Sequence, residues 1–392
     1  MELLLHHNQD RDMLEAAFSL AVRAHAGYIA QLLVQHGADP GECGPDALVP
    51  LGEAVDCGSP GLVEALLDHR LLGRYSTAEL REARELARRW REAGAEAELR
   101  RRTGCEEAPV RARVRDDEYC TVGELALGGM TVRDGHGAIL TRLEELLGIR
   151  ASFEELMARA LEHDQDHSAW WASTSLLGNR REEETWAAAL ALRTHPDPAH
   201  RLFGAGVLRL VQLFDDSEAD AFAAPALELF VPWAAEEADL AVLIEVLIAL
   251  GEHADARAAT ALLAHAGHPD ARVRHAVANG LGTWPEPSAL AEKVREALLV
   301  LMDDGDPTVR REACRTVGWG RDRTPVLTEA MAALLDDADR RVQLVAVEGL
   351  ALHHDDRCVE AARRLGPPRP GFSDEETCLG TAWRYKWRRD GR

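Results

Sequence analysis

The sequence of 392 residues contains little of several residue types that mark common protein classes. Aromatic residues account for only 5% of the chain, and its 45 basic residues include just two lysines, Lys293 and Lys386. Because strands favour aromatic and β-branched side chains, the scarcity of aromatics argues against a sheet protein. Alanine and leucine are abundant instead, and both favour helices. The excess of arginine over lysine is typical of a GC-rich genome and is not a functional signal.

Long apolar runs and paired cysteines are also absent. No apolar stretch approaches the ~18–20 residues that span a bilayer, and the start Met1–His7 lacks the basic region of a signal peptide. The seven cysteines are scattered, with no C-x-x-C pair, in a chain too large to need disulfides. We therefore expect reduced thiols, a cytoplasmic location and no membrane contact.

The formal net charge of −22 argues against a general nucleic-acid binder, because affinity for phosphates comes mostly from lysine and arginine. Residues 70–115 are the exception, with 13 arginines against eight acids. A contact with an anion or a nucleic acid is one interpretation of this stretch. Since glutamate alternates with arginine throughout, we expect instead a solvated helix face with pairs such as Glu85–Arg89.

The second half of the chain is built from a repeated pattern. The stretch Asp270–Gly282 returns as Asp306–Gly318 and as Asp339–Leu350, each a turn followed by a helix with one apolar face. The residues 3, 7 and 11 positions after the aspartate share that face, and the aspartate is well placed as the N-cap. Six units begin at Asp166, Asp197, Asp239, Asp270, Asp306 and Asp339. The clearest of the helices that precede them are Ala258–His265, Ala289–Met302 and Val326–Leu335.

The run Asp306-Pro-Thr-Val-Arg310 matches the D-P-x-V-R motif of HEAT repeats. This part of the chain resembles the short HEAT-like form that is also seen in bilin lyase-type proteins. The resemblance covers about residues 150–365 and implies stacked helix pairs, but it implies little about activity because the motif residues are structural. HEAT-repeat deoxyhypusine hydroxylases carry His-Glu dipeptides for a di-iron site. This sequence has no such dipeptide, so that chemistry is not expected.

The first hundred residues carry a different repeat. Ala21–Leu33 and Ala54–Leu66 lie 33 residues apart, with matching apolar positions. The turn Gly37–Pro40 and the start Pro50–Ala54 resemble those of ankyrin repeats, although Gly52 stands where those repeats usually have histidine. We expect ankyrin-like helical repeats with a degenerate third unit over residues 1–104.

Residues 105–149 interrupt the helical rhythm as an irregular joint followed by a helix that ends near Leu147. Val110–Val114 alternates like a strand, and Gly128-Gly129 precedes a second extended run, Met130–Arg133. The chain is thus predicted to be all-α, an α-solenoid with a short irregular or β-hairpin-like insert. Cys120 and His136 in this joint form a conceivable nucleophile pair, but no family signature surrounds either residue.

Residues 366–392 form a Pro/Gly break and a C-terminal helix. Ser373–Glu376 is a capping box, and the helix that follows carries Trp383 and Trp387 beside four basic residues. The favoured interpretation is a lid, with the two tryptophans covering the last repeat and the basic residues meeting the acidic array. The alternative is an aromatic-basic hook for a partner.

Histidine and aspartate gather at several of the turns. The clusters are His163–His167, His195–His200, His265–His268 and His353–Asp356. Two histidines at i,i+4 can share a metal ion. However, the clusters recur because the repeat recurs, and both residue types cap helices. We therefore expect no metal site and no cofactor.

The predicted function is non-catalytic: a repeat scaffold that binds another protein through its concave helical surface. Candidate contact residues stand 5 and 9 positions after the last three turn aspartates, and they are His275, Asn279, Arg311, Arg315, Leu344 and Glu348. One alternative is a DNA-binding HEAT-like alkylated-base glycosylase, with Trp170, Trp171 or Trp319 stacking on a base. Another is an immunity or regulatory protein whose acidic array masks a basic partner. The oligomeric state is left open.

Overall fold

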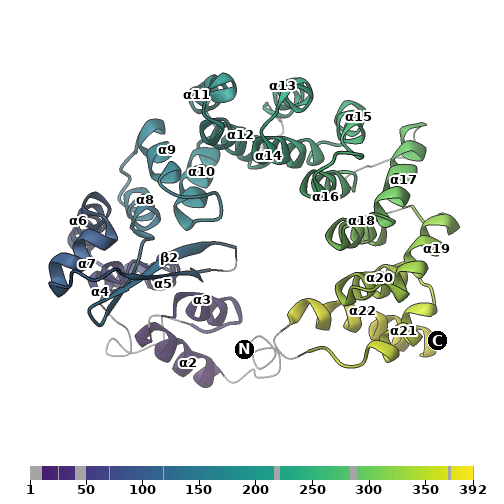
Figure 1. Cartoon of the computed structure of the whole chain (residues 1–392). Coiled ribbons are helices and arrows are strands. Elements are labelled where there is room, and N and C mark those ends of the chain that lie inside the picture. Colours follow the sequence, from purple (N-terminus) through teal and green to yellow (C-terminus); the bar gives the residue numbers. More distant parts are fainter. Residues whose placement is uncertain are drawn as a thin grey trace. The chain divides into compact units, whose positions relative to one another are not determined.

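The computed structural model describes residues 11–24, 26–39, 50–69, 71–117, 119–215, 221–282, 289–320, 322–369 and 372–391. The chain is an all-α solenoid of stacked helix pairs with one small sheet, as predicted (Figure 1). It divides into two compact units, Met1–Leu192 and Arg193–Arg392, so the division falls inside the predicted HEAT-like array. The predicted boundaries after residues 104, 149 and 365 stay predictions. No described helix combines the length and apolar character needed to cross a bilayer.

In unit 1 the three strands of a small sheet follow one group of helices in the sequence and precede a second group. They are α2 Arg11–Arg23, α3 Gly27–Gln35, α4 Leu51–Asp56, α5 Pro60–Leu66, α6 Thr77–Ala93, α7 Ala95–Thr103, β1 Val110–Arg115, β2 Thr121–Leu127, β3 Met130–Arg133, α8 His136–Leu146, α9 Phe153–Leu161, α10 Ser168–Arg180 and α11 Glu183–Ala191. One short 3-10 turn, Leu72–Arg74, lies between α5 and α6, and another, Leu192–Thr194, lies at the boundary between the units.

The 33-residue spacing of the N-terminal repeats is visible in the core of unit 1. Val22 and Val55 are fully buried, as are Leu33 and Leu66 to within 1% exposure, and all four belong to one hydrophobic cluster that α8 completes with Ile139. Residues 33 positions apart are therefore buried in the same core in both helix pairs. The ankyrin-like character of these pairs stays a prediction.

The insert is an antiparallel sheet with strand order β1-β2-β3. β1 and β3 were predicted, whereas the central strand β2 was not, because its run Thr121–Leu127 lacks strict alternation. Gly128 and Gly129 form the β2–β3 turn with φ of +58° and +81°, values that favour glycine and fit a tight hairpin. The two predicted strands therefore do not form a hairpin with each other, because each pairs with β2, which lies between them.

Unit 2 is entirely helical in its described part. Its elements are α12 Pro198–Leu213, α13 Ala223–Glu236, α14 Leu240–Gly251, α15 Ala256–Ala264, α16 Ala271–Gly280, α17 Ala289–Met302, α18 Pro307–Trp319, α19 Pro325–Ala333, the 3-10 turn Leu334–Asp336, α20 Arg340–Leu352, α21 Arg357–Leu365 and α22 Ser373–Asp390. The even-numbered helices from α12 to α22 contact one another in succession and form the inner row of unit 2, on its concave side in Figure 1. The odd-numbered helices form the outer row.

The turn aspartates start the inner helices as predicted. Asp197, Asp239, Asp270, Asp306 and Asp339 are all N-caps, and each carboxylate accepts a hydrogen bond from the backbone N–H two residues on. The exception is the first predicted unit, because α10 in unit 1 is capped by His167 and not by Asp166. There the imidazole Nδ1 accepts the backbone N–H of Ala169 at 3.1 Å.

An arginine four residues after the turn aspartate ties neighbouring repeats together. In the clearest case Arg310 donates two hydrogen bonds to Asp337, at 2.8 and 2.9 Å, and one to the backbone carbonyl of Asp304 at 2.8 Å. Asp337 in turn accepts the backbone N–H of Asp339, the next turn aspartate, at 2.8 Å. We call this set of contacts a rung. Each rung gives the backbone carbonyls of one turn a hydrogen-bond donor and holds the carboxylate that positions the next turn. The rungs are Arg201–Glu237, Arg274–Asp304 and Arg310–Asp337.

Where the arginine of the rung is missing, the carboxylate that it would bind is missing too. Leu243 occupies the arginine position of α14, and the residue two before the next turn aspartate is then His268 instead of a carboxylate. His268 caps its own turn, because its Nδ1 accepts the backbone N–H of Asp270 at 3.1 Å. Trp170 and His195 occupy the same two sequence positions two repeats earlier. A carboxylate without its arginine would be half-buried and unpaired, so the two residues change together.

The last helix pair of unit 2 is α21–α22, because α22 packs on α20 as the next member of the inner row. Leu379 and Ala382 of α22 are buried in that contact. The helix begins at Ser373 with Phe372 as its N-cap, and the predicted capping box depends on the Ser373 side chain, which lies outside the described residues. The predicted lid is thus a repeat-like helix that ends the array.

We expect the Arg310 rung to be worth more than an exposed ion pair. The Arg310 side chain is 17% exposed and Asp337 only 7%, so the variant Arg310→Ala leaves a buried carboxylate and two turn carbonyls without their donor. The free energy of unfolding should fall by about 2–4 kcal/mol. In urea denaturation the control Arg272→Ala, whose arginine is 68% exposed, should lose less than about 1 kcal/mol. Equal losses in the two variants would contradict the role of the rung.

Candidate functional site

The candidate interface is the open face of the inner row in unit 2. It consists of the side chains 5 and 9 positions after each turn aspartate, and we call it the inner face. Asn279 and Arg315 are exposed on it, while His275 and Arg311 are half-buried beside them. The structure therefore brings these four predicted residues together on the adjacent helices α16 and α18.

A buried carboxylate organises this part of the inner face. Glu312 of α18 is 2% exposed, and its two oxygens lie 2.6 Å from Arg315 Nη2 and 3.5 Å from His275 Nε2. Desolvation lowers the pKa of His275, with the charges of Arg311 and Arg315 adding to the effect, although Glu312 opposes it. The neutral imidazole is therefore favoured, and the cationic groups of this face are the two arginines.

The other two predicted contact residues are not accessible. Leu344 is 3% exposed and Glu348 6%, because α22 covers this side of α20. Glu348 accepts a hydrogen bond from the Cys378 thiol of α22 at a sulfur–oxygen distance of 3.6 Å. The periodicity that placed them on the open side of the helix was right, but the helix that follows them in the row closes that side. They are core residues of the last contact and not interface residues.

Equivalent positions on the preceding inner helices extend the inner face and were not predicted. Leu202 of α12 and Ile244 and Ile248 of α14 all stand at the same offsets and are partly exposed. The sequence carried this signal, because the offsets apply to every repeat. The inner face thus changes along the row from apolar side chains on α14 to paired arginines on α18.

The tryptophans of α22 do not act as the predicted lid would require. Trp383 is 41% exposed and Trp387 79%, whereas the contact with α20 is made by smaller residues. Arg389 does meet an acid of the preceding turn, since its Nη1 lies 2.5 Å from Asp356, whereas Lys386 pairs with Asp390 of its own helix. The helix covers the last repeat, but its two tryptophans remain on the surface.

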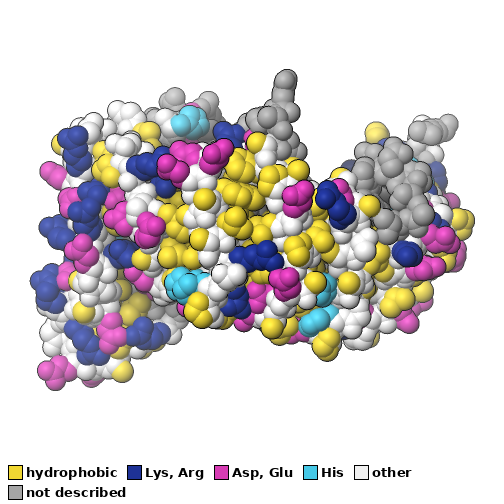
Figure 2. Space-filling model, turned by 90° about the horizontal axis from the view of Figure 1, so that it is seen from above, with side chains coloured by type: hydrophobic (Ala, Val, Ile, Leu, Met, Phe, Trp, Pro, Cys, Tyr) yellow, Lys and Arg dark blue, Asp and Glu magenta, His cyan; other side chains and the backbone are white. Residues whose placement is uncertain are grey.

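A second surface of unit 2 is apolar but has few anchoring groups. Between α13 and α15 lies a shallow groove of about 450 Å³, lined mostly by alanines together with Val231 and Arg257. Figure 2, seen from the side on which these outer helices lie in Figure 1, shows hydrophobic side chains gathered near the middle of the face. Small side chains give this groove little shape, so it is a weaker candidate than the inner face.

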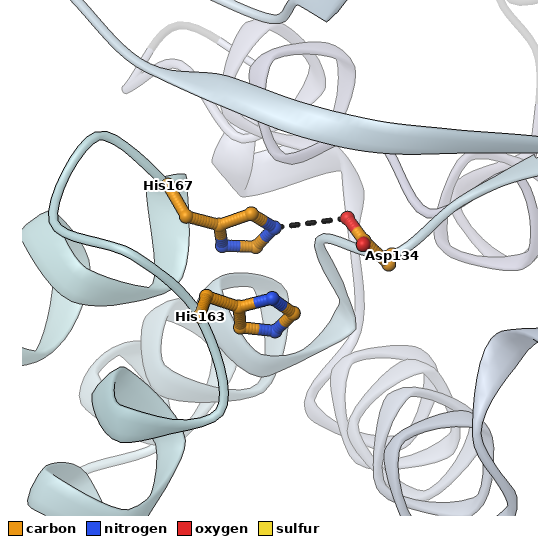
Figure 3. Close-up of side chains that lie close together, drawn as sticks. All are labelled: Asp134, His163 and His167. Carbon is orange, nitrogen blue, oxygen red and sulfur yellow. Dashed lines mark hydrogen bonds and ion pairs between the residues drawn. The ribbon is translucent and has the colours of Figure 1, made fainter. Parts of the chain in front are cut away.

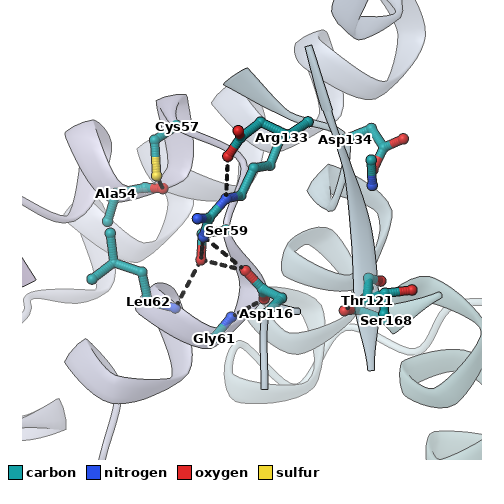
Figure 4. A network of polar contacts seen from close by, with 12 residues as sticks. Ala54, Cys57, Ser59, Gly61, Leu62, Asp116, Thr121, Arg133, Asp134 and Ser168 are labelled. Atoms are coloured by element: carbon teal, nitrogen blue, oxygen red, sulfur yellow. Dashed lines mark hydrogen bonds and ion pairs between the residues drawn. The ribbon is translucent and has the colours of Figure 1, made fainter. Parts of the chain in front are cut away.

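In unit 1 the sheet is fixed to the helices by a buried polar network (Figure 4). Asp116 is fully buried and accepts hydrogen bonds at 2.6 Å from both the Ser59 hydroxyl and the backbone N–H of Gly61, at the start of α5. Arg133 of β3 approaches the same carboxylate to 3.2 Å. Burial raises the pKa of Asp116, although these donors oppose the shift. We interpret the network as structural, because the Asp116 carboxylate is bound by Ser59, Gly61 and Arg133 of the protein itself.

Asp134, His163 and His167 are the one group of three possible metal ligands that the described residues bring together (Figure 3). His167 Nδ1 accepts the backbone N–H of Ala169, so Nε2 carries the ring proton and donates it to Asp134 at 2.9 Å. A metal-bound histidine needs its other nitrogen protonated and donating, which the N–H of Ala169 prevents here. The donor set therefore does not fit a metal ion.

The contacts explain what this cluster does instead. Asp134 also accepts the backbone N–H of Gly123 in β2 at 2.7 Å, while the rings of His163 and His167 stack at 3.6 Å. Arg113 of β1 binds Asp164 in the same turn at 2.7 and 2.8 Å. The sheet is thereby joined to the start of α10 as firmly as it is to α5. The predicted capping role of this histidine cluster is confirmed at His167.

Cys120 and His136 are not a nucleophile pair in the described contacts. Burial raises the pKa of the Cys120 thiol to about 12, so it is not a thiolate near neutral pH. His136 is 2% exposed, stacks on Trp90 at 4.8 Å between ring centroids, and has a pKa lowered to about 4 by desolvation. Both residues pack within unit 1 and neither is presented to a substrate.

The arginine-rich stretch is largely ion-paired, as expected. Arg100 pairs with Glu96 and Arg102 with both Glu98 and Asp56. The particular pair predicted within α6 does not form, because Glu85 pairs with Arg84 and Arg88 instead of Arg89. These contacts leave no contiguous basic track in the described part of the stretch.

The buried imidazole of His136 makes a pH-dependent contribution to stability. Its folded pKa of about 4 lies below its ordinary value of 6.5, so the contribution is complete above pH 6.5 and is lost as the pH falls toward 4. The loss amounts to about 3 kcal/mol. Urea unfolding of His136→Gln from neutral pH to pH 4 should show a correspondingly flatter pH dependence. The control His69→Gln changes an exposed histidine and should keep the slope of the parent protein.

A family model supports the repeat architecture in part of unit 2. Residues 268–351, which span α16 to α20, match the family of HEAT repeats. Among solved structures, YibA from Escherichia coli is similar at 14% sequence identity and a TM-score of 0.42, with 60% of this chain and 93% of YibA covered. The curated proteins contain no match. The chain thus contains HEAT-like repeats, and the match includes the rungs formed by Arg274 and Arg310.

Proposed function

We propose that the protein is a non-catalytic repeat scaffold that binds another protein through the inner face of unit 2. One observation carries the proposal: the side chains 5 and 9 positions after the turn aspartate remain open on the three successive inner helices α14, α16 and α18, while the positions 3, 7 and 11 after that aspartate are buried. The residues that hold the repeats together are thus separate from those that face outward. Such separation lets a stacked array present a long surface to a partner.

The composition of the inner face supports a polypeptide partner. Ile244 and Ile248 offer apolar area on α14, and Arg311 and Arg315 offer guanidinium groups two helices further on. Arginine and well-packed apolar side chains contribute strongly to protein interfaces. Coverage of Leu344 and Glu348 by α22 ends the inner face at α20.

The glycosylase alternative has no comparable support. Trp170 is 9% exposed and belongs to the core, while the exposed Trp171 shares its pocket with three carboxylates and Trp319 lies at the end of α18 in the other unit. A net charge of −22 opposes binding to a polyanion. Masking of a basic partner, the other alternative, would use an acidic surface, whereas the charged groups of the inner face are Arg311 and Arg315.

The proposal predicts that Arg311 and Arg315 are needed for partner binding, in addition to the stability that the Arg315–Glu312 ion pair contributes. Affinity capture from the native host with the full chain should retain a specific protein, and the double variant Arg311→Ala, Arg315→Ala should weaken that binding about tenfold or more. Arg363→Ala, Arg364→Ala is a matched control, because both arginines are 54% exposed on the outer helix α21.

Three results would decide the matter. Loss of the retained protein in the inner-face variant alone, while circular dichroism shows that the variant is still folded under the capture conditions, supports the proposal. Equal retention by the inner-face variant, the control variant and the parent protein would place the binding surface elsewhere. Parallel losses in both variants would point to nonspecific attraction by arginine.

A further inference from the structure

Unit 1 has its own pocket, which the proposed interface does not include. The pocket has a volume of about 370 Å³ and lies over α8, between α5 on one side and α10 on the other. Ala138 and Thr141 of α8 form part of its floor. Because these side chains are short, α8 leaves room between its two neighbours. All of the lining residues belong to unit 1.

One wall of the pocket is an aromatic side chain that the core does not use. Trp171 is 48% exposed and lines the pocket from α10, whereas the adjacent Trp170 is 9% exposed and packs inside. Trp171 stands five residues after Asp166, the same offset that faces outward in unit 2. An exposed indole face attracts cations through its quadrupole, and tryptophan does so best.

The remaining charges of the pocket are mostly negative. Three carboxylates line it, from Glu64, Asp117 and Glu145, against the single guanidinium of Arg142. Arg142 divides its contacts between two of them, at 3.1 Å from Glu64 and 2.7 Å from Glu145. Desolvation raises the pKa of Glu64, with Arg142 opposing the shift and Glu145 adding to it. The one internal cation therefore does not neutralise the pocket.

We propose that this pocket receives an arginine side chain of the protein partner, with its guanidinium between the indole of Trp171 and the carboxylates of Glu64 and Glu145. The inference rests on the proposed function and deepens it by naming the chemistry of one contact. A guanidinium is planar, stacks on an aromatic face and donates in a fork that matches a carboxylate. An ammonium group satisfies only the charge, and an anion or a nucleic-acid phosphate would meet three carboxylates.

The pocket can be tested without knowing the partner. The full chain is labelled with 5-fluorotryptophan, and the fluorine resonance of Trp171 is assigned by its absence in Trp171→Phe. N-acetyl-L-arginine amide is then titrated at about 0.15 M salt, where distant surface charges are screened. We expect the Trp171 resonance to shift and to saturate, and the exposed Trp319 of unit 2 to stay in place. The citrulline analogue has the same shape without the charge and should bind at least about tenfold more weakly.

A pair of charge variants separates the pocket from the general acidity of the chain. Glu64→Gln, Glu145→Gln should weaken arginine binding about tenfold or more, because it removes the carboxylates nearest Arg142. Glu92→Gln, Glu154→Gln removes the same charge from exposed positions of unit 1 and should leave the binding unchanged. Equal binding of arginine and citrulline would overturn the proposal. Equal losses of arginine binding in both charge variants, or a Trp171 resonance that does not move, would also overturn the proposal. Tighter binding of the lysine analogue than of the arginine analogue would contradict the assignment of a guanidinium as the bound group.

Failure of this inference and failure of the proposed function give different results. If arginine shifts Trp171 but the Arg311, Arg315 variant retains its partner fully, the pocket stands and the inner face of unit 2 is wrong. If that variant loses its partner but arginine does not bind, protein binding stands and the pocket is wrong. Retention of the same partner by the Glu64, Glu145 variant tests the link between the two, and it should fall together with arginine binding.

Discussion

The bridge between each inner-helix arginine and the turn of the next repeat is the interaction on which unit 2 depends. A turn between helices leaves backbone carbonyls without partners and leaves the next helix without a fixed starting point. Arg201, Arg274 and Arg310 meet both needs, because each donates to carbonyls of its own turn and to a carboxylate that positions the following turn aspartate. Where leucine replaces arginine, histidine replaces the carboxylate, so that no buried charge is left alone.

Because some positions of each repeat pack and others do not, binding surfaces can form only at the positions that stay open. Positions 7 and 11 after the turn aspartate are committed to the core and stay small or aliphatic along unit 2, while position 4 forms the rung wherever it is arginine. On α14, α16 and α18 positions 5 and 9 have no such role, and they range from isoleucine to arginine, whereas on α20 they pack under α22. The joint in unit 1 follows a similar logic. Asp116 and Asp134 bind the sheet to α5 and α10 respectively, and Trp171 and the carboxylates beyond them are left facing a pocket.

Part of the candidate site was predictable and part was not, for identifiable reasons. Helical periodicity placed His275, Asn279, Arg311 and Arg315 on one side of their helices, which depends only on local geometry. The same rule placed Leu344 and Glu348 there, but it could not show that α22 would pack over them. Strand β2 was missed because its pairing with β1 and β3, rather than its own pattern, makes it a strand. Trp170 and Trp171 are adjacent and alike in sequence, yet only one faces the core.

The sequence by itself determined the repeat, its turn caps and the all-helical class, because hydrophobic period, capping and short-range turn chemistry are local properties. Only the tertiary structure decided which equivalent positions stay open, since burial depends on the element that packs next. It also decided that Glu64, Asp117, Glu145 and Trp171 line one pocket, although they come from three helices and a strand turn. Such convergence follows from how the helices stack, and no spacing along the chain encodes it.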